Sequence, residues 1–176
     1  VPGHPVAGKE RSGVAAAAAD LFDGCNVALT PLARTDADAL GLVRRMWRAI
    51  GARVIRMEVE AHDRALALTS HLPHVLAYAM VDLFAASADD DRLHDLVAGG
   101  FYDFTRTASS DAEMWRDICL MNRTKILRHI DSFGERLAHL RDLIERADGA
   151  ALESLFAAAK ESRASLAERR KPSKQS

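Results

Sequence analysis

A polar segment at the start of the chain carries the first group that could do acid–base chemistry. Residues 3–13 combine His4 with Lys9, Glu10, Arg11 and three glycines. This composition is typical of a loop, and loops on a rigid scaffold are where binding and catalytic groups concentrate. Because histidine titrates closest to neutral pH, His4 is a candidate catalytic residue. The alternative is a glycine-rich connector whose imidazole is merely solvated.

Further histidines lie close together along the chain, at His62, His71 and His74. His62 stands near an expected helix start, where capping or solvation would also explain it. His71 and His74 are three residues apart and share one face of a helix, a spacing that permits a metal site. No His-Glu-x-x-His motif or neighbouring cysteine pair accompanies them, and Pro73 disturbs the helix. We therefore expect no metal, and a metal-dependent helical enzyme is the weaker alternative.

A second polar cluster follows Gly99 and Gly100. Asp103 and Arg106 alternate there with aromatic residues, and we expect a turn that sets a charged pair among large apolar side chains. Arg106 would then form a structural ion pair with Asp103. Equally, its planar guanidinium could hold a substrate carboxylate through two hydrogen bonds, a geometry that lysine cannot match. Trp115 lies further on and is a candidate for the same region.

Composition and charge exclude several classes of partner. The chain has 176 residues, of which 48% are apolar and 28% charged, and its formal net charge is −1. No global positive charge favours nucleic acid, and no apolar run is long enough to cross a bilayer. We therefore expect neither nucleic acid nor a membrane as a partner. Cys25 and Cys119 do not make a disulfide framework, so we expect reduced thiols and a cytoplasmic protein.

The first third of the chain predicts alternating helices and strands. We expect a short alanine-rich helix over 14–21, strands over 26–30 and 53–57, and a helix between the strands that begins at Thr35 and ends before Gly51. These elements are typical of the closing part of an open α/β sheet. The G-x-G-x-x-G fingerprint of a dinucleotide-binding half does not occur among them.

From residue 58 onward the strand signals stop and helical periodicity takes over. We expect helices over 60–86, 110–148 and 150–166, the first of them bent at Pro73 because proline removes a backbone donor. Their apolar stripes exceed what one short bundle buries. This excess favours a homodimer over the alternative, a monomeric bundle with long helices.

Five motifs along the chain, taken together, carry a resemblance. They are His4-Pro5 with Gly8, Glu10 and Ser12-Gly13; His62-Asp63; Ser70-His71-Leu72-Pro73-His74; Gly100-Phe101 with Asp103-Phe104-Thr105-Arg106; and Met114-Trp115-Arg116-Asp117. In order and spacing they resemble the prephenate/arogenate dehydrogenase family, over residues 4 to about 123. Each motif is weak alone, and the combination is specific.

The resemblance implies a fold that agrees with the periodicity. The expected class is mainly α, with the C-terminal αβ units of a Rossmann-type domain followed by an all-helical dimerisation domain. We accordingly expect a nucleotide-binding segment over 1–57, a helical substrate-binding and dimerisation domain over 58–168, and a flexible basic tail over 169–176. The resemblance also implies that most of the nucleotide-binding domain precedes Val1.

The resemblance further implies an activity, the NAD(P)-dependent oxidative decarboxylation of prephenate to 4-hydroxyphenylpyruvate in tyrosine biosynthesis. His4 matches the catalytic histidine, a neutral acceptor for the C4 hydroxyl. Arg106 matches the arginine that grips a substrate carboxylate. By the same analogy the remaining substrate-binding residues are His74, His62, His71 and Trp115. Glu10 and Asp103 would form an ionic network with Arg106 that gates access.

The implied partners are small molecules and a second copy of the chain. The substrate would be prephenate or arogenate, tyrosine a possible feedback inhibitor, and the assembly a homodimer. The cofactor would be NAD or NADP, held mainly by residues upstream of Val1. The strongest alternative is that this polypeptide by itself is a non-catalytic helical module that dimerises and binds tyrosine as an effector.

Overall fold

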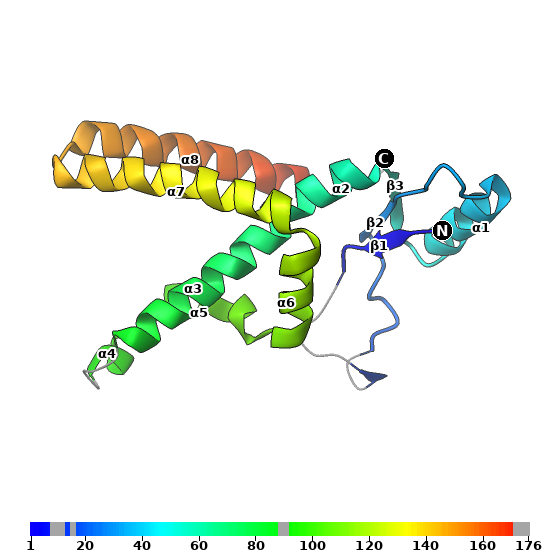
Figure 1. Ribbon diagram of the computed structural model, residues 1–176, viewed down its shortest axis with the longest axis horizontal. Coiled ribbons are helices and arrows are strands. Elements are labelled where there is room, and N and C mark those ends of the chain that lie inside the picture. The colour runs from blue at the N-terminus through cyan, green and yellow to red at the C-terminus, as the bar shows by residue number, and fades with distance from the viewer. Residues whose placement is uncertain (8–12, 15–16, 88–91, 171–176) are drawn as a thin grey trace. The chain divides into compact units, whose positions relative to one another are not determined.

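The chain is mainly helical, with one small sheet near its start (Figure 1). The predicted fold class, αβ elements followed by an all-helical part, is confirmed. The chain divides into two compact units, Val1–His129 and Ile130–Ser176. The computed structural model describes residues 1–7, 13–14, 17–87 and 92–170.

The sheet has three strands in the order β1-β2-β3. β2 (Asn26–Leu29) and β3 (Arg53–Arg56) are parallel, so both predicted strands are confirmed. β1 (Gly3–Pro5) was not predicted; it pairs antiparallel with β2 and places His4 opposite Ala28. The loop expected around His4 therefore begins as an edge strand, which holds the backbone of this histidine in a fixed register.

Helix α1 (Ala37–Ala49) connects β2 to β3, as predicted. Gly51, the predicted C′ residue, has φ +85°, a conformation that favours glycine. The helix starts one residue later than expected. Asp36 is the N-cap, and its carboxylate accepts a hydrogen bond from the backbone N–H of Ala39. The hydroxyl of Thr35 instead accepts from the backbone N–H of Leu32. The small core of this region consists of Val27, Leu29 and Ala52, with Phe22, Leu40, Val43, Trp47 and Val54 packed against it.

The alanine-rich helix predicted over 14–21 is wrong for the described residues. Residues 19–24 form hydrogen-bonded turns, with Leu21 N donating to Ala18 O and Asp23 N to Asp20 O. Isolated helices shorter than about 12 residues are marginal even when rich in alanine, and they depend on an apolar face that packs elsewhere. Among the described residues of this segment, Val14 is 94% exposed and does not contribute to such a face.

Helices α2 (Val59–Leu66) and α3 (Leu72–Ala86) form one rod, joined by a π-helical turn (Ala67–His71) (Figure 1). The predicted helix and its disturbance at Pro73 are confirmed. Pro73 lies in the first turn of α3 and has no N–H to offer to the carbonyl of Thr69. The wider π-helical turn occurs where that regular hydrogen bond is missing.

The turn predicted over 99–106 is wrong, because these residues are helical. After α4 (Arg92–Asp95), α5 (Gly99–Thr105) begins at the two glycines and continues into a 3₁₀ turn (Arg106–Ser109). The ring centroids of Phe101 and Phe84 on α3 are 5.1 Å apart. Packing against α3 thus outweighs the weak helix propensity of glycine, which is about 1 kcal/mol per residue.

The single helix predicted over 110–148 is wrong, because it is two helices. α6 (Ala112–Met121) ends at Asn122, and α7 (Arg123–Glu145) follows. The capping prediction also shifts by one residue: Asp111 accepts from Met114 N at 2.7 Å, whereas the Ser110 carbonyl accepts from the Tyr78 hydroxyl on α3. Trp115 lies in the first turn of α6, as expected.

The second unit is a helical hairpin made by α7 from Ile130 onward and by α8 (Gly149–Arg170), which lie side by side in both figures. Asp148 begins α8 by accepting from Ala151 N, so the helix predicted over 150–166 is confirmed. Residues 171–176 of the expected tail lie outside the described residues. None of the helices in the described ranges is long and apolar enough to span a membrane.

Candidate active site

A cavity of about 700 Å³ lies within the first unit, and segments far apart in the sequence line it. They are the end of β1, the π-helical turn with the start of α3, the residues after α5, and α6. The predicted site residues that line this cavity are His4, His71, His74, Arg106 and Trp115. Residues from opposite ends of a 112-residue stretch, His4 to Trp115, thus meet at one place.

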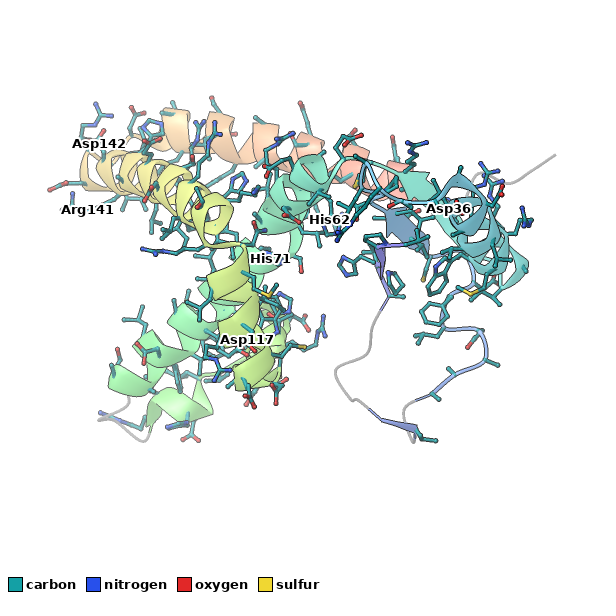
Figure 2. All side chains as sticks on the ribbon, turned by 45° about the vertical axis from the view of Figure 1, so that its right-hand side comes forward. Asp36, His62, His71, Asp117, Arg141 and Asp142 are labelled. Carbon is teal, nitrogen blue, oxygen red and sulfur yellow. The ribbon has the colours of Figure 1, made fainter. Side chains whose placement is uncertain are left out.

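The other predicted site residues lie elsewhere. His62 does not line the cavity, although its ring contacts His4. Asp103 is exposed on α5 and is also absent from the cavity wall. Glu10 lies outside the described residues, so the predicted ionic network cannot be traced through it. Figure 2 labels His62 and His71, which come from successive parts of the α2–α3 rod.

Backbone pairing on both sides of β1 positions His4. Thr30 N donates to Pro2 O before the strand, and Val6 N donates to Asn26 O after it. The edge strand is short, but these bonds extend its pairing with β2 by one residue in each direction. The backbone that carries His4 is therefore tied down, and its ring extends toward α2.

His4 is the end of a chain of two hydrogen bonds. His4 Nδ1 lies 3.0 Å from His62 Nε2, and His62 Nδ1 lies 2.9 Å from the Asp63 carboxylate. A carboxylate only accepts, so the His62 proton is on Nδ1 and its Nε2 accepts from His4 Nδ1–H. The neutral His4 ring then has its lone pair on Nε2. This arrangement makes His4 an acceptor for a substrate hydroxyl.

Burial lowers the pKa of His4, and the neighbouring His62 lowers it further. Burial also lowers the pKa of His71, with His74 as the next cause and Asp63 acting in the opposite sense. Desolvation disfavours the charged imidazolium, and so does a second ring that can carry positive charge. Both histidines are therefore neutral at pH 7, the state in which an imidazole can accept a proton.

An aromatic wall bounds the cavity at α6. The His74 ring stacks on Trp115, with centroids 3.7 Å apart and planes 17° apart. His74 Nδ1–H donates to the Ser70 carbonyl at 2.8 Å, which holds the ring in this orientation. Trp115 is 6% exposed, and its indole N–H has no hydrogen-bond partner in the described part of the chain. The wall is thus a flat pair of stacked rings.

Arg106 provides the cationic side of the cavity. It follows α5 and opens the 3₁₀ turn, next to Thr107 and near Ser110 along the cavity wall. The residue is exposed. A cavity with an acceptor at His4 and a permanent cation at Arg106 suits a molecule that carries both a hydroxyl and a carboxylate.

The described residues contain no group of three or more His, Cys, Asp or Glu side chains arranged to hold a metal ion. Cys25 and Cys119 are free cysteines. Two residues that hydrogen-bond to the site histidines are not among the predicted site residues. They are Asp63, which contacts His62, and Asn122, which contacts His71. A histidine followed directly by an aspartate was a signal for the first, and nothing in the sequence marked the second.

Two family models cover most of the chain. Residues 58–158 match the prephenate dehydrogenase dimerization domain, and residues 1–56 match the prephenate dehydrogenase nucleotide-binding domain. The chain belongs to the prephenate dehydrogenase family. The predicted family resemblance is thereby confirmed, and a dimerization domain is present.

Curated members of the family are similar over almost the whole chain. A cyclohexadienyl dehydrogenase of Zymomonas mobilis is 40% identical over 168 residues, which are 94% of this chain and 57% of the relative. A prephenate dehydrogenase of Bacillus subtilis is 38% identical over 175 residues, which are 97% of this chain and 46% of the relative. The chain thus spans about half the length of these relatives.

Solved structures of the family have the same fold. The prephenate dehydrogenase of Aquifex aeolicus, in complex with hydroxyphenyl propionate and NAD+, is 40% identical with a TM-score of 0.87, over 93% of this chain and 58% of that one. The arogenate dehydrogenase of Synechocystis is 27% identical with a TM-score of 0.81, over 93% of this chain and 60% of that one.

Proposed function

We propose that this chain provides the catalytic histidine and the substrate cavity of an NAD(P)-dependent prephenate or arogenate dehydrogenase in tyrosine biosynthesis. The observation that carries the proposal is the pair of contacts from His4 Nδ1 to His62 Nε2 and from His62 Nδ1 to Asp63, from which we infer that His4 Nε2 is an acceptor. The cavity beside it has the size of a small-molecule site and contains a cation at Arg106. The family supplies the reaction class.

The described residues do not form a dinucleotide site. Such a site needs a glycine-rich turn that leads into a helix N-terminus, where the pyrophosphate is bound. α1 is the helix between the two parallel strands, and its N-terminus is capped by the carboxylate of Asp36, which would repel a phosphate. We therefore propose that other residues of the complete polypeptide hold NAD or NADP. The roles that we propose for residues of this chain concern the substrate alone.

The proposed reaction places the C4 hydroxyl of the substrate at His4. Nε2 accepts the hydroxyl proton while C4 is oxidised by loss of a hydride, for which the oxidised nicotinamide of NAD or NADP would be the acceptor. The resulting carbonyl allows the ring carboxylate to leave as CO2. The electron pair of the broken carbon–carbon bond completes the aromatic ring and leaves a phenolate oxygen, which takes the proton back from His4. Aromatisation makes the overall step strongly favourable. The contribution of this chain is to orient the hydroxyl, to receive its proton and to return it to the product.

We propose distinct roles for the residues around the substrate. Arg106 binds a substrate carboxylate, and the stacked His74–Trp115 pair and His71 form the wall against which the ring lies. His62 accepts a hydrogen bond from His4 Nδ1–H and does not contact the substrate, in contrast to the sequence-based prediction. Gating by Asp103 and Glu10 stays a prediction.

We retain the proposed division of the chain at residues 57 and 168, with a homodimer formed through the helical domain. The described apolar side chains of the hairpin are consistent with such a partner, because several are exposed. On α7 and α8 they include Phe133, Leu137, Ile144, Phe156 and Leu166. Burying them against a second copy would stabilise the dimer by about 25 cal/mol for each Å² of apolar surface removed from water.

A second candidate function applies to this polypeptide alone. The chain spans about half the length of its curated relatives, and its described residues hold no dinucleotide site. It would then dimerise and bind tyrosine without catalysis. Calorimetry of this polypeptide and of the complete one separates the two candidates. A non-catalytic module binds tyrosine at most, whereas the catalytic arrangement requires that the complete polypeptide also bind NAD or NADP.

The proposed activity is tested with the complete polypeptide. We expect reduced nicotinamide and 4-hydroxyphenylpyruvate to form from prephenate, or tyrosine from arogenate, with CO2 released in equal amount. Assays of both substrates with NAD and with NADP identify the preferred pair. Absence of turnover with all four combinations, in a protein that is folded and dimeric, would refute the proposal.

The support of His4 by His62 predicts a specific pattern of variants. His62→Ala in the complete polypeptide is expected to lower kcat about tenfold, because Nδ1–H of His4 loses its acceptor and the productive tautomer is no longer favoured. His62→Gln offers an amide oxygen to the same donor, so we expect it to recover most of the rate. Steady-state kinetics on prephenate measure both.

A rise in KM with unchanged kcat in His62→Ala would instead support the substrate-binding role suggested by the sequence. His139→Ala is a matched control, because this histidine is exposed on α7 in the other unit. It should leave both constants unchanged.

A further inference from the structure

Asn122 lies at the break between α6 and α7 and joins two segments far from it in sequence. Its Nδ2 lies 2.8 Å from the backbone oxygen of Asp63 and 3.2 Å from Nδ1 of His71. These contacts span 59 and 51 residues, and both are partly buried. Asn122 itself does not line the cavity, so any influence on a ligand passes through His71.

The Asp63 carbonyl determines which way the amide points. A carbonyl oxygen only accepts, so the NH₂ end of Asn122, and not its oxygen, faces Asp63. The same NH₂ group has a second N–H, which reaches Nδ1 of His71. Oδ1 of Asn122 is buried without a hydrogen-bond partner among the described residues. That unsatisfied oxygen is a cost of this orientation, which the two donated bonds offset.

The orientation of the amide has a consequence for His71. Because Asn122 donates to Nδ1, this nitrogen carries the lone pair and the His71 proton is on Nε2. The Nδ1 edge of the ring faces Asn122, outside the cavity wall, and His71 is itself a wall residue. Nε2–H is therefore the hydrogen-bonding group of the ring that is left for a ligand in the cavity that His71 lines.

We propose that Asn122 is a positioning residue that holds His71 in its Nε2–H tautomer, so that the cavity presents a hydrogen-bond donor at His71 and an acceptor at His4. This inference rests on the proposed function for the identity of the ligand. A substrate with a hydroxyl and carboxylate or carbonyl oxygens binds in one direction only: its hydroxyl lies at His4 and an oxygen at His71. Reversal would place an oxygen that only accepts, such as that of a carboxylate, against the lone pair of His4.

The acceptor at His4 and the donor at His71 both depend on Asp63. Asp63 accepts from His62 through its carboxylate and from Asn122 through its backbone oxygen. The residue that orders the His62–His4 pair thus also orients the amide that orders His71. The acceptor and the donor of the cavity are set by a single residue of α2.

The test uses the complete polypeptide labelled with ¹⁵N in its histidines. Long-range ¹H–¹⁵N correlation spectra distinguish a ring nitrogen that carries a proton from one with a lone pair. We expect His71 to show Nε2–H in the wild-type protein and Nδ1–H, with the lone pair on Nε2, in Asn122→Asp, because the carboxylate is isosteric but only accepts. Assignment of the signal comes from its loss in His71→Gln. A wild-type His71 with its proton on Nδ1 overturns the inference.

Kinetics provide the second readout. Asn122→Asp is expected to raise KM for prephenate about tenfold, with kcat changed much less, because a donor to the substrate is lost. Asn26→Asp introduces the same charge at an exposed position of β2 and should change neither KM nor the His71 signal. A tautomer that responds as expected, with KM unchanged, would refute the role of His71 in binding this substrate. The tautomer of His71 is measured without a substrate, so the result holds even if prephenate is not the substrate. Failure of this inference is therefore distinguishable from failure of the proposed function.

Discussion

Replacing His4 by asparagine in the complete polypeptide is expected to lower kcat on prephenate by about 10²-fold or more and to change KM little. The asparagine amide can still form a hydrogen bond, but it cannot take a proton from the C4 hydroxyl. His4 is well suited to that step because its Nδ1–H is bound by His62, which leaves Nε2 as the acceptor. The rate of reduced nicotinamide formation at saturating substrate measures the effect.

The pH dependence of the wild-type protein tests the same role. The neutral form of His4 is the active one, so kcat/KM should fall as the pH drops through the pKa of this group. Burial and His62 lower that pKa below the ordinary value of 6.5, so the acid limb is expected below pH 6.5. A limb above that pH, or an asparagine variant that keeps most of its kcat, would contradict the assignment.

Replacing Arg106 by alanine is expected to raise KM for prephenate about 10- to 100-fold, with a smaller change in kcat. Arg106 lines the cavity, and a guanidinium can bind a carboxylate through two parallel donors, an interaction that is present before and during the reaction. Arg106→Lys keeps the charge but not the paired donors, so its KM should fall between those of the wild type and the alanine variant. Initial-rate measurements over a range of prephenate concentrations give the constants.

Arg116→Ala is the matched control for this arginine. Arg116 is exposed on α6, where it pairs with Glu113 and Asp117 instead of facing the cavity. Its loss removes the same charge from the same helical unit and should leave KM unchanged. If both alanine variants raise KM equally, the effect is a general one of charge, and Arg106 has no specific contact with the substrate.

Much of the fold follows from periodicity and turn residues. The strands over 26–29 and 53–56 and α1 between them carry local signals, and so does the helical remainder of the chain. The predictions of secondary structure are wrong at places where tertiary contacts, and not local sequence, determine the conformation. Gly99 and Gly100 predict a turn, yet Phe101 packs against Phe84 and the segment is a helix.

The candidate site could be predicted as a set of residues but not as a geometry. The sequence motifs single out five residues that the cavity brings together, namely His4, His71, His74, Arg106 and Trp115. Their roles stay predictions. The approach of His4 to His62 joins residues 58 apart, and a sequence does not show which ring nitrogen faces which partner. Asn122 could not be predicted either, because it lies at the break between α6 and α7, and helical periodicity does not show that the helix is interrupted there.

The π-helical turn over Ala67–His71 also determines the rotational phase of the helical rod. Each residue of an α-helix advances the direction of its side chain by about 100°. Shortening the turn by one residue, to a regular helix, would therefore rotate α2 relative to α3 by roughly that angle. His62 would leave the side occupied by His4 while His71 and His74 kept theirs. The residue count of this turn thus sets the alignment between the proton acceptor and the wall of the cavity.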